Sequence, residues 1–153
     1  MAKLNLKNIE ELKKYIGKEL GTSDWHMVTQ EAINMFADAT GDHQWIHVDV
    51  ERAKKESPYG GPIAHGYYTI SLGPVLLAEI FNLEEKKMGI NYGLEKLRFP
   101  APVPIGKNVR LRAELKELNE VKGGVQAHLQ FTFEVEDQQK PACVAEAIYR
   151  YYI

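Results

Sequence analysis

From Val109 to Leu115 and from Val125 to Val135, every second residue of the chain is apolar, and the residues between are polar or charged. A period of two is that of a β-strand, whose successive side chains point to opposite faces of a sheet. Gly123 and Gly124 lie between the two stretches and predict the turn of a β-hairpin. The pattern therefore predicts an antiparallel sheet with one face buried and the other in water.

Three further strands are predicted around this hairpin. They run from Leu20 to Val28, from Asn91 to Phe99 and from Ala142 to Tyr152. A run of alternating prolines follows the second of them and ends it, because proline cannot donate to the hydrogen bonds of a sheet.

Helices are predicted in the first half of the chain. Three short ones cover residues 8–16, 30–39 and 50–56. Thr29 and Asp49 are suitable N-caps for the second and third, because their side-chain oxygens can accept a hydrogen bond from the first turn. Thr40 and Gly41 are expected to end the second helix.

The stretch from Tyr67 to Phe81 is apolar on nearly all sides, which predicts a helix buried all round. Gly73 and Pro74 interrupt it, and the proline should bend the helix because it removes one backbone hydrogen bond. An antiparallel sheet on one buried helix is an α+β arrangement. The length of 153 residues fits one domain, which we place over residues 1–153.

The composition argues against several classes of function. A formal net charge of -2 leaves no basic excess for binding nucleic acid. Cys143 is the only cysteine, so no internal disulfide can form, and a reducing, cytoplasmic location is expected. Residues 1–7 lack the apolar core of a signal peptide. The longest apolar run is interrupted by Glu79 and is too short to span a bilayer.

The segment from Gly41 to His47 is the first candidate for chemistry. Asp42 and His47 are five residues apart in a stretch too rich in turn formers for a regular helix. In a loop the two side chains can converge on one water as an acid–base pair. Gly66 precedes the long apolar stretch, where its backbone N–H could face a developing negative charge.

The sequence from Phe36 to Asp49 resembles the signature of the MaoC-like, R-specific enoyl-CoA hydratases, and Pro62 to Gly66 resembles the second motif of that family. Two motifs in the right order, about 20 residues apart, are more specific than either alone. Gln44 and Trp45 replace the commoner Asn-Pro and resemble the nodulation protein N-like branch. The resemblance implies a hot-dog fold, in which an antiparallel β-sheet wraps around a long central α-helix.

The resemblance also implies an activity, the reversible syn addition of water to a trans-2-enoyl-CoA to give a (3R)-3-hydroxyacyl-CoA. Asp42 and His47 would hold the water, and one would take a proton from it while the other supplies a proton to C2. The Gly66 N–H would bind the thioester oxygen. The resemblance implies no metal and no organic cofactor apart from the coenzyme A of the substrate, which could instead be an acyl-carrier thioester.

Three further residues are candidates for supporting the site or binding substrate, namely Gln44, His65 and Ser71. Gln44 could orient the acid–base pair, and His65 could be a hydrogen-bonding residue at the helix start. A serine of the family falls on or near Pro74 in this chain, with Ser71 close by. The resemblance therefore leaves open how the central helix supports the site.

Simpler interpretations remain open for the same residues. Asp42 after a glycine could be a turn residue, and His47 could be a buried histidine of the core. His43, His47 and His65 lack the close spacing or cysteine partners of a metal site, so we expect no metal.

Two other functions are compatible with a fold of this kind, since fold alone does not decide activity. An acyl-CoA thioesterase would need a carboxylate along the central helix, where Glu79 comes late in the sequence. A non-catalytic acyl-thioester-binding protein would not need the acid–base pair. A homodimer is expected in each case, because a single sheet on one helix leaves edge strands to be paired.

Overall fold

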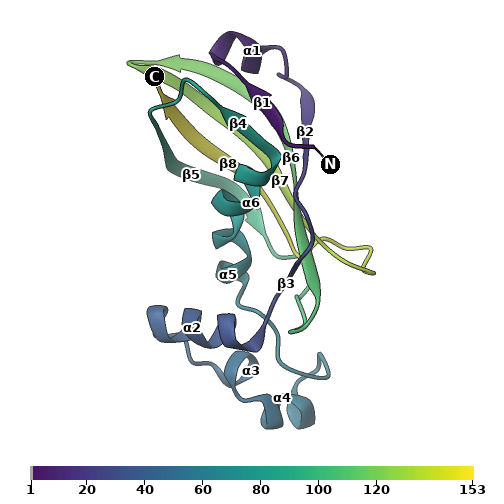
Figure 1. The fold of residues 1–153 in the computed structure, drawn as a ribbon. Coiled ribbons are helices and arrows are strands. Elements are labelled where there is room, and N and C mark those ends of the chain that lie inside the picture. Colours follow the sequence, from purple (N-terminus) through teal and green to yellow (C-terminus); the bar gives the residue numbers. More distant parts are fainter. Residues whose placement is uncertain (1) are drawn as a thin grey trace.

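The computed structural model describes residues 2–153 and has an antiparallel sheet with two consecutive helices on one face (Figure 1). The strand order is β2-β6-β7-β8-β5, and β3 pairs with β6 beyond the end of β2. The strands of this sheet are β2 (Lys18–Thr22), β3 (His26–Met27), β5 (Met88–Arg98), β6 (Asn108–Val121), β7 (Gly124–Val135) and β8 (Cys143–Tyr152). The predicted α+β class is confirmed.

The hairpin of β6 and β7 is confirmed, with Val109 opposite Val135 and Val121 opposite Gly124. Along β7 the apolar residues are buried, while the residues between them are partly exposed on the other face. The strands predicted over 91–99 and 142–152 are β5 and β8 with slightly different ends. A small parallel pair was not predicted, formed by β1 (Leu4–Leu6) and β4 (Phe81–Leu83).

The strand predicted from Leu20 to Val28 is wrong as one element, because β2 and β3 are separate. Between them, the Ser23 hydroxyl accepts a hydrogen bond from the Leu111 N–H, and the Asp24 N–H donates to the Glu79 carboxylate. These bonds draw the chain out of a regular ladder. The first helix is also shorter than predicted, since α1 (Ile9–Lys13) covers only part of residues 8–16.

The central helix consists of two helices, α5 (Gly66–Ser71) and α6 (Gly73–Ile80), separated by Leu72. The predicted interruption is therefore present, one residue before Gly73. Pro74 lies in the first turn of α6, where its missing N–H would have no partner in any case. The prediction that this helical stretch is buried on all sides is wrong. Tyr67 is 68% exposed and Val75 is 58% exposed, because the sheet covers only one side of the helices.

Three more helices lie beyond the end of the sheet (Figure 1), namely α2 (Gln30–Thr40), α3 (Trp45–Val48) and α4 (Val50–Glu56). The predicted caps are confirmed, because the side chain of Thr29 accepts from the Ala32 N–H and that of Asp49 from the Arg52 N–H. Gly41 ends α2 with a φ of 82°, a left-handed conformation that glycine adopts without strain. We call residues 30–65 the helical lobe.

Two hydrophobic cores stabilise these layers. The larger core lies between α6 and the sheet, where Leu76, Leu77 and Ile80 pack with buried residues of β6, β7 and β8. The smaller core joins the helical lobe to the end of the sheet and consists of Val28, Ile33, Ala64, Val103, Val109, Val135 and Ala142. No helix in residues 2–153 is long and apolar enough to cross a membrane.

Candidate active site

Asp42 lies in the turn that follows α2. Its Oδ1 accepts a hydrogen bond from the Gln44 N–H at 3.3 Å, which closes a small turn around the carboxylate. The side chain is 51% exposed. Gln44 therefore supports Asp42 through its backbone N–H.

His47 lies on α3, a short helix in a segment where the sequence predicted only a loop. It is buried, and its Nδ1 lies 2.7 Å from the backbone carbonyl oxygen of Ile63. A carbonyl oxygen can only accept, so Nδ1 carries the hydrogen and the neutral ring has its lone pair on Nε2. The imidazole is therefore held in the tautomer that can take a proton through Nε2.

The environment of His47 lowers the pKa of its imidazole below the usual 6.5. Burial is the main cause, because it disfavours the charged form. The bond to Ile63 acts in the opposite direction, the neighbouring His65 lowers the pKa further, and Asp42 raises it. A neutral imidazole at neutral pH is suited to act as a general base.

Asp42 and His47 converge as predicted, and His65 joins them. Each of the three side chains offers one ligand atom, and these atoms lie within 4.8 Å of one another. Two groups that bond to the same water are about 4–5.5 Å apart, because each hydrogen bond is about 2.8 Å long. Asp42 and His47 can therefore share one water molecule.

His65 comes directly before α5 and is almost completely buried, with 2% exposure. Its ring stacks on that of His47, with centroids 3.9 Å apart. Its Nε2 lies 3.0 Å from the backbone carbonyl oxygen of Asp42. That nitrogen is also 3.9 Å from the Asp42 carboxylate, but it donates to the carbonyl and has no lone pair for a metal. The three residues are close enough for a metal ion, but of the two ring nitrogens of His65 only Nδ1 keeps a lone pair.

Gly66 is the first residue of α5, so its N–H has no acceptor within the helix. It lines a pocket of about 370 Å³ together with His47 and Thr69. A side-chain Cβ at Gly66 would lie 3.1 Å from the ring of Phe99, which also lines this pocket. The absence of a side chain therefore lets the aromatic ring lie close to the start of α5.

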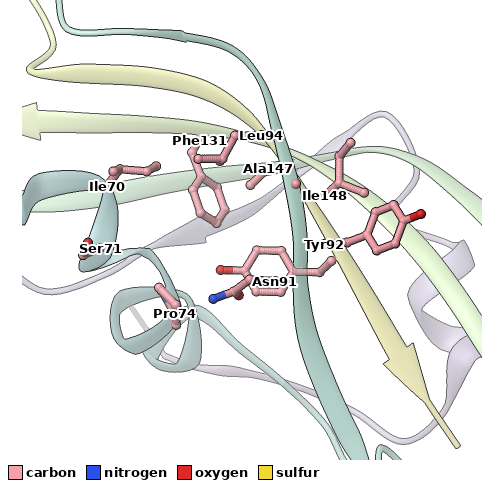
Figure 2. A pocket seen from close by; sticks show the side chains of 11 residues that line it. Ile70, Ser71, Pro74, Asn91, Tyr92, Leu94, Phe131, Ala147 and Ile148 are labelled. Carbon is pink, nitrogen blue, oxygen red and sulfur yellow. The ribbon is translucent and has the colours of Figure 1, made fainter. Parts of the chain in front are cut away.

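Ser71 belongs to a different pocket, shown in Figure 2. Its hydroxyl donates to the carbonyl of Tyr67 at 2.6 Å, one turn back in α5. This second pocket has a volume of about 410 Å³ and lies between the helices and the sheet. Ile70 and Pro74 line it on the helix side, with Leu94 and Phe131 on the sheet side (Figure 2). Ser71 and Pro74 are thus not among the residues that line the pocket of His47.

Three residues of the site were not predicted from the sequence. Thr69 is buried and lines the pocket of His47, and its position three residues after Gly66 could have indicated that the two share a helix face. Phe99 had no local signal, because it follows the end of β5 and reaches Gly66 only through the fold. Gln30 donates from its side-chain amide to the His47 carbonyl at 2.8 Å and ties α2 to α3.

Comparisons with known proteins agree with this arrangement. The profile of the family described as "MaoC like domain" matches residues 11–136. The chain is 50% identical over 145 residues to 3-hydroxyacyl-thioester dehydratase Z of Mycobacterium tuberculosis, covering 94% of this chain and 95% of the relative. It is 41% identical over 143 residues to nodulation protein N of Rhizobium meliloti, covering 92% and 89%.

Among solved structures, the chain is similar to the (R)-hydratase from A. caviae involved in PHA biosynthesis. The TM-score is 0.70 at 25% identity, and the match covers 84% of this chain and 93% of that one.

Proposed function

Because this chain belongs to the MaoC-like dehydratase family and is a hydro-lyase, we propose that it is an (R)-specific enoyl-CoA hydratase. It would add water reversibly to a trans-2-enoyl-CoA and give a (3R)-3-hydroxyacyl-CoA. The observation that carries the proposal is the nearness of the Asp42 carboxylate to a His47 ring that is bonded through Nδ1. The relative named 3-hydroxyacyl-thioester dehydratase Z supports the same type of reaction.

The geometry suggests which residue carries out each step of the hydration. His47 takes a proton from the shared water through Nε2, while the Asp42 carboxylate accepts a hydrogen bond from the other O–H of that water and orients it. The water oxygen then bonds to C3, and the thioester oxygen gains the negative charge of an enolate. The Gly66 N–H binds that oxygen, and a fixed donor needs no reorganisation as the charge develops. The proton that His47 took from the water then passes to C2, directly or by way of Asp42. The hydroxyl at C3 and the hydrogen at C2 together account for one water.

The second pocket is our candidate for the acyl chain (Figure 2). Ile70, which lines it, comes directly after Thr69 of the first pocket in α5. Most of its residues are apolar. Each methylene buried there contributes about 0.8 kcal/mol, so kcat/KM should rise roughly fourfold per carbon until the pocket is full.

The thioesterase alternative is less well supported. Glu79 is the only carboxylate on α5 and α6. Its oxygens lie 3.0 Å from the Asp24 backbone nitrogen and 2.5 Å from His26 Nε2, and it lines neither pocket described above. A carboxylate with these bonds is not free to activate a water near Gly66. No observation favours a binding protein without turnover, and the proposed hydration needs neither a metal nor an organic cofactor.

The decisive experiment is hydration of crotonyl-CoA and longer enoyl-CoAs, followed by the loss of absorbance of the conjugated thioester. Carrying out the reaction in deuterated water adds a stereochemical test. We expect a (3R) product with oxygen and deuterium on the same face, because Asp42 and His47 come from one segment and would deliver the water and the proton from one side. An S product, or addition to opposite faces, would contradict the proposal.

A further inference from the structure

His65 contacts both members of the proposed acid–base pair. Its ring is stacked on the His47 ring at 3.9 Å with an interplanar angle of 25°. The Phe36 ring lies 4.9 Å away at 57°. With 2% exposure, His65 is surrounded by other side chains, and it is not among the residues that line the pocket of His47 and Gly66. It therefore touches the catalytic groups and does not face the substrate.

The hydrogen bond of His65 reaches a distant part of the chain. Its Nε2–H donates to the backbone carbonyl of Asp42, 23 residues earlier, at 3.0 Å. The other bonds of the turn that carries Asp42 are local, and they include those from the Gln44 N–H to the Asp42 carboxylate and from the Asp42 N–H to Thr40. The His65 bond is therefore the contact that relates the position of Asp42 to α5.

The other ring nitrogen of His65, Nδ1, does not connect two parts of the chain. Nδ1 is buried and has no hydrogen-bond partner among the residues that the structure describes. A phenylalanine would fill this space and stack on His47 without burying an unpaired acceptor. What the imidazole adds over a phenyl ring is the single bond from Nε2 to the Asp42 carbonyl.

We propose that His65 is a positioning residue for the hydration. Its Nε2–H fixes the turn of Asp42 through a hydrogen bond, and its ring packs against the face of the His47 ring. Together these contacts keep the Asp42 carboxylate and the His47 imidazole at a separation that one water molecule can bridge. This inference rests on the proposed function, but the contacts of His65 with Asp42 and His47 can be tested in the protein without substrate.

Two variants separate the two contacts. In His65→Phe the ring remains and the donor is lost, and in His65→Gln an amide N–H replaces Nε2–H and the ring is lost. A displacement of about 1 Å can reduce the rate about 10²-fold, so we expect a loss of this size in kcat for His65→Phe. KM should change little, because His65 does not line the pocket. His65→Gln should retain kcat within about tenfold of the wild type, because it keeps the bond to Asp42.

The matched control is His43→Gln. His43 is 54% exposed, its Nε2 lies 2.9 Å from an Asp38 carboxylate oxygen, and its loss should leave kcat unchanged. A His65→Phe variant that retains wild-type kcat would overturn the hydrogen-bond half of the proposal.

A second readout needs no substrate. The chain has five histidines, so the His47 ring can be followed by NMR during a pH titration. Asp42 and His65 are the titratable groups that bear on its pKa, and His65 lowers it. In His65→Phe the titration midpoint of His47 should therefore move to higher pH.

If the wild type hydrates no enoyl thioester but this midpoint moves, the proposed function fails, while the contact between His65 and His47 in the free protein is upheld. Wild-type kcat together with an unchanged midpoint in His65→Phe would overturn the positioning role.

Discussion

At the scale of single residues, Asp42 and His47 carry the proposed chemistry, and their substitution is the most direct test of it. We expect Asp42→Asn and His47→Gln each to reduce kcat about 10²–10⁴-fold, because each removes an acid–base group and keeps a similar shape. Steady-state hydration of the best enoyl-CoA measures the loss. Circular dichroism checks that the fold is retained.

Exposed residues of the same types provide controls for these variants. Asp38 has a side chain that is 78% exposed, and the His26 side chain is 45% exposed. Asp38→Asn and His26→Gln should leave kcat within twofold or so of the wild type, as is usual for exposed groups away from a site. Near wild-type turnover in either Asp42→Asn or His47→Gln would show that the proposed pair is wrong.

The lowered pKa of His47 gives a second prediction at this scale. Hydration requires the deprotonated imidazole, so kcat/KM should fall as the pH drops through the pKa of His47 in the free enzyme. Since burial holds this pKa below 6.5, the acid limb should have its midpoint below that value, and activity should be flat through neutral pH. A pH profile of kcat/KM measures the midpoint, and a value above 6.5 would rule out His47 as the base.

Part of the site could be predicted from the sequence, and the reason is its local spacing. Asp42 and His47 are close in the chain, and the glycine between them and α2 indicates a turn that lets them converge. The stacking of His65 on His47 could not be predicted, because it joins residues of two motifs through the fold. The approach of Phe99 to Gly66 depends on how β5 leaves the sheet, which no local pattern encodes.

At the scale of elements, the start of α5 permits an unusually clean test of the Gly66 N–H. Position 66 is the first of the helix, where proline is well tolerated, and His65 already has the extended φ of -61° and ψ of 138° that a following proline requires. Gly66→Pro should therefore remove the donor without breaking α5. We expect kcat to fall about 10²–10³-fold, as for the loss of one oxyanion donor.

Gly66→Ala is the matched control, because it adds a Cβ and keeps the N–H. That Cβ would lie 3.1 Å from the Phe99 ring, which is 42% exposed and can move outward. The variant should mainly raise KM, and the double variant with Phe99→Ala should restore it. Equal losses of kcat in the alanine and proline variants would assign the effect to crowding by Phe99.

The elements differ in how well the sequence predicts them. The β6–β7 hairpin follows from alternation, because a shift by one residue would expose every apolar side chain. The capped helices α2 and α4 follow from Thr29 and Asp49. The break between β2 and β3 depends on bonds from Ser23 and Asp24 to distant residues, so a pattern within residues 20–28 could not reveal it.

At the scale of the whole molecule, the hot-dog arrangement implied by the two motifs is confirmed by the similar solved structures. Within it, β5 is an edge strand with unusually exposed apolar residues. Met88, Ile90, Tyr92 and Leu94 are each between 40% and 55% exposed. Edge strands of this kind pair with other chains. We therefore expect a homodimer joined through β5, with twice the mass of one chain by light scattering.

A charge on this edge should weaken the pairing. Ile90→Lys is expected to shift the protein towards the monomer without unfolding it, because the side chain is already partly exposed. Met35→Lys is the control, since Met35 is 60% exposed on α2, away from the sheet edge. A wild-type mass that stays monomeric at all concentrations would contradict the expected dimer.

The two separate cores have a consequence for how the molecule opens. Amide hydrogen exchange reports local opening, and segments with little buried apolar surface open with the lowest free energy. The helical lobe is joined to the sheet through the smaller core, whose members are mostly valines and alanines. Amides of α2 should therefore exchange faster than those of β7, and low urea should remove activity while the sheet persists. The protein would then lose the proposed acid–base pair by a local transition, well before the chain as a whole denatures.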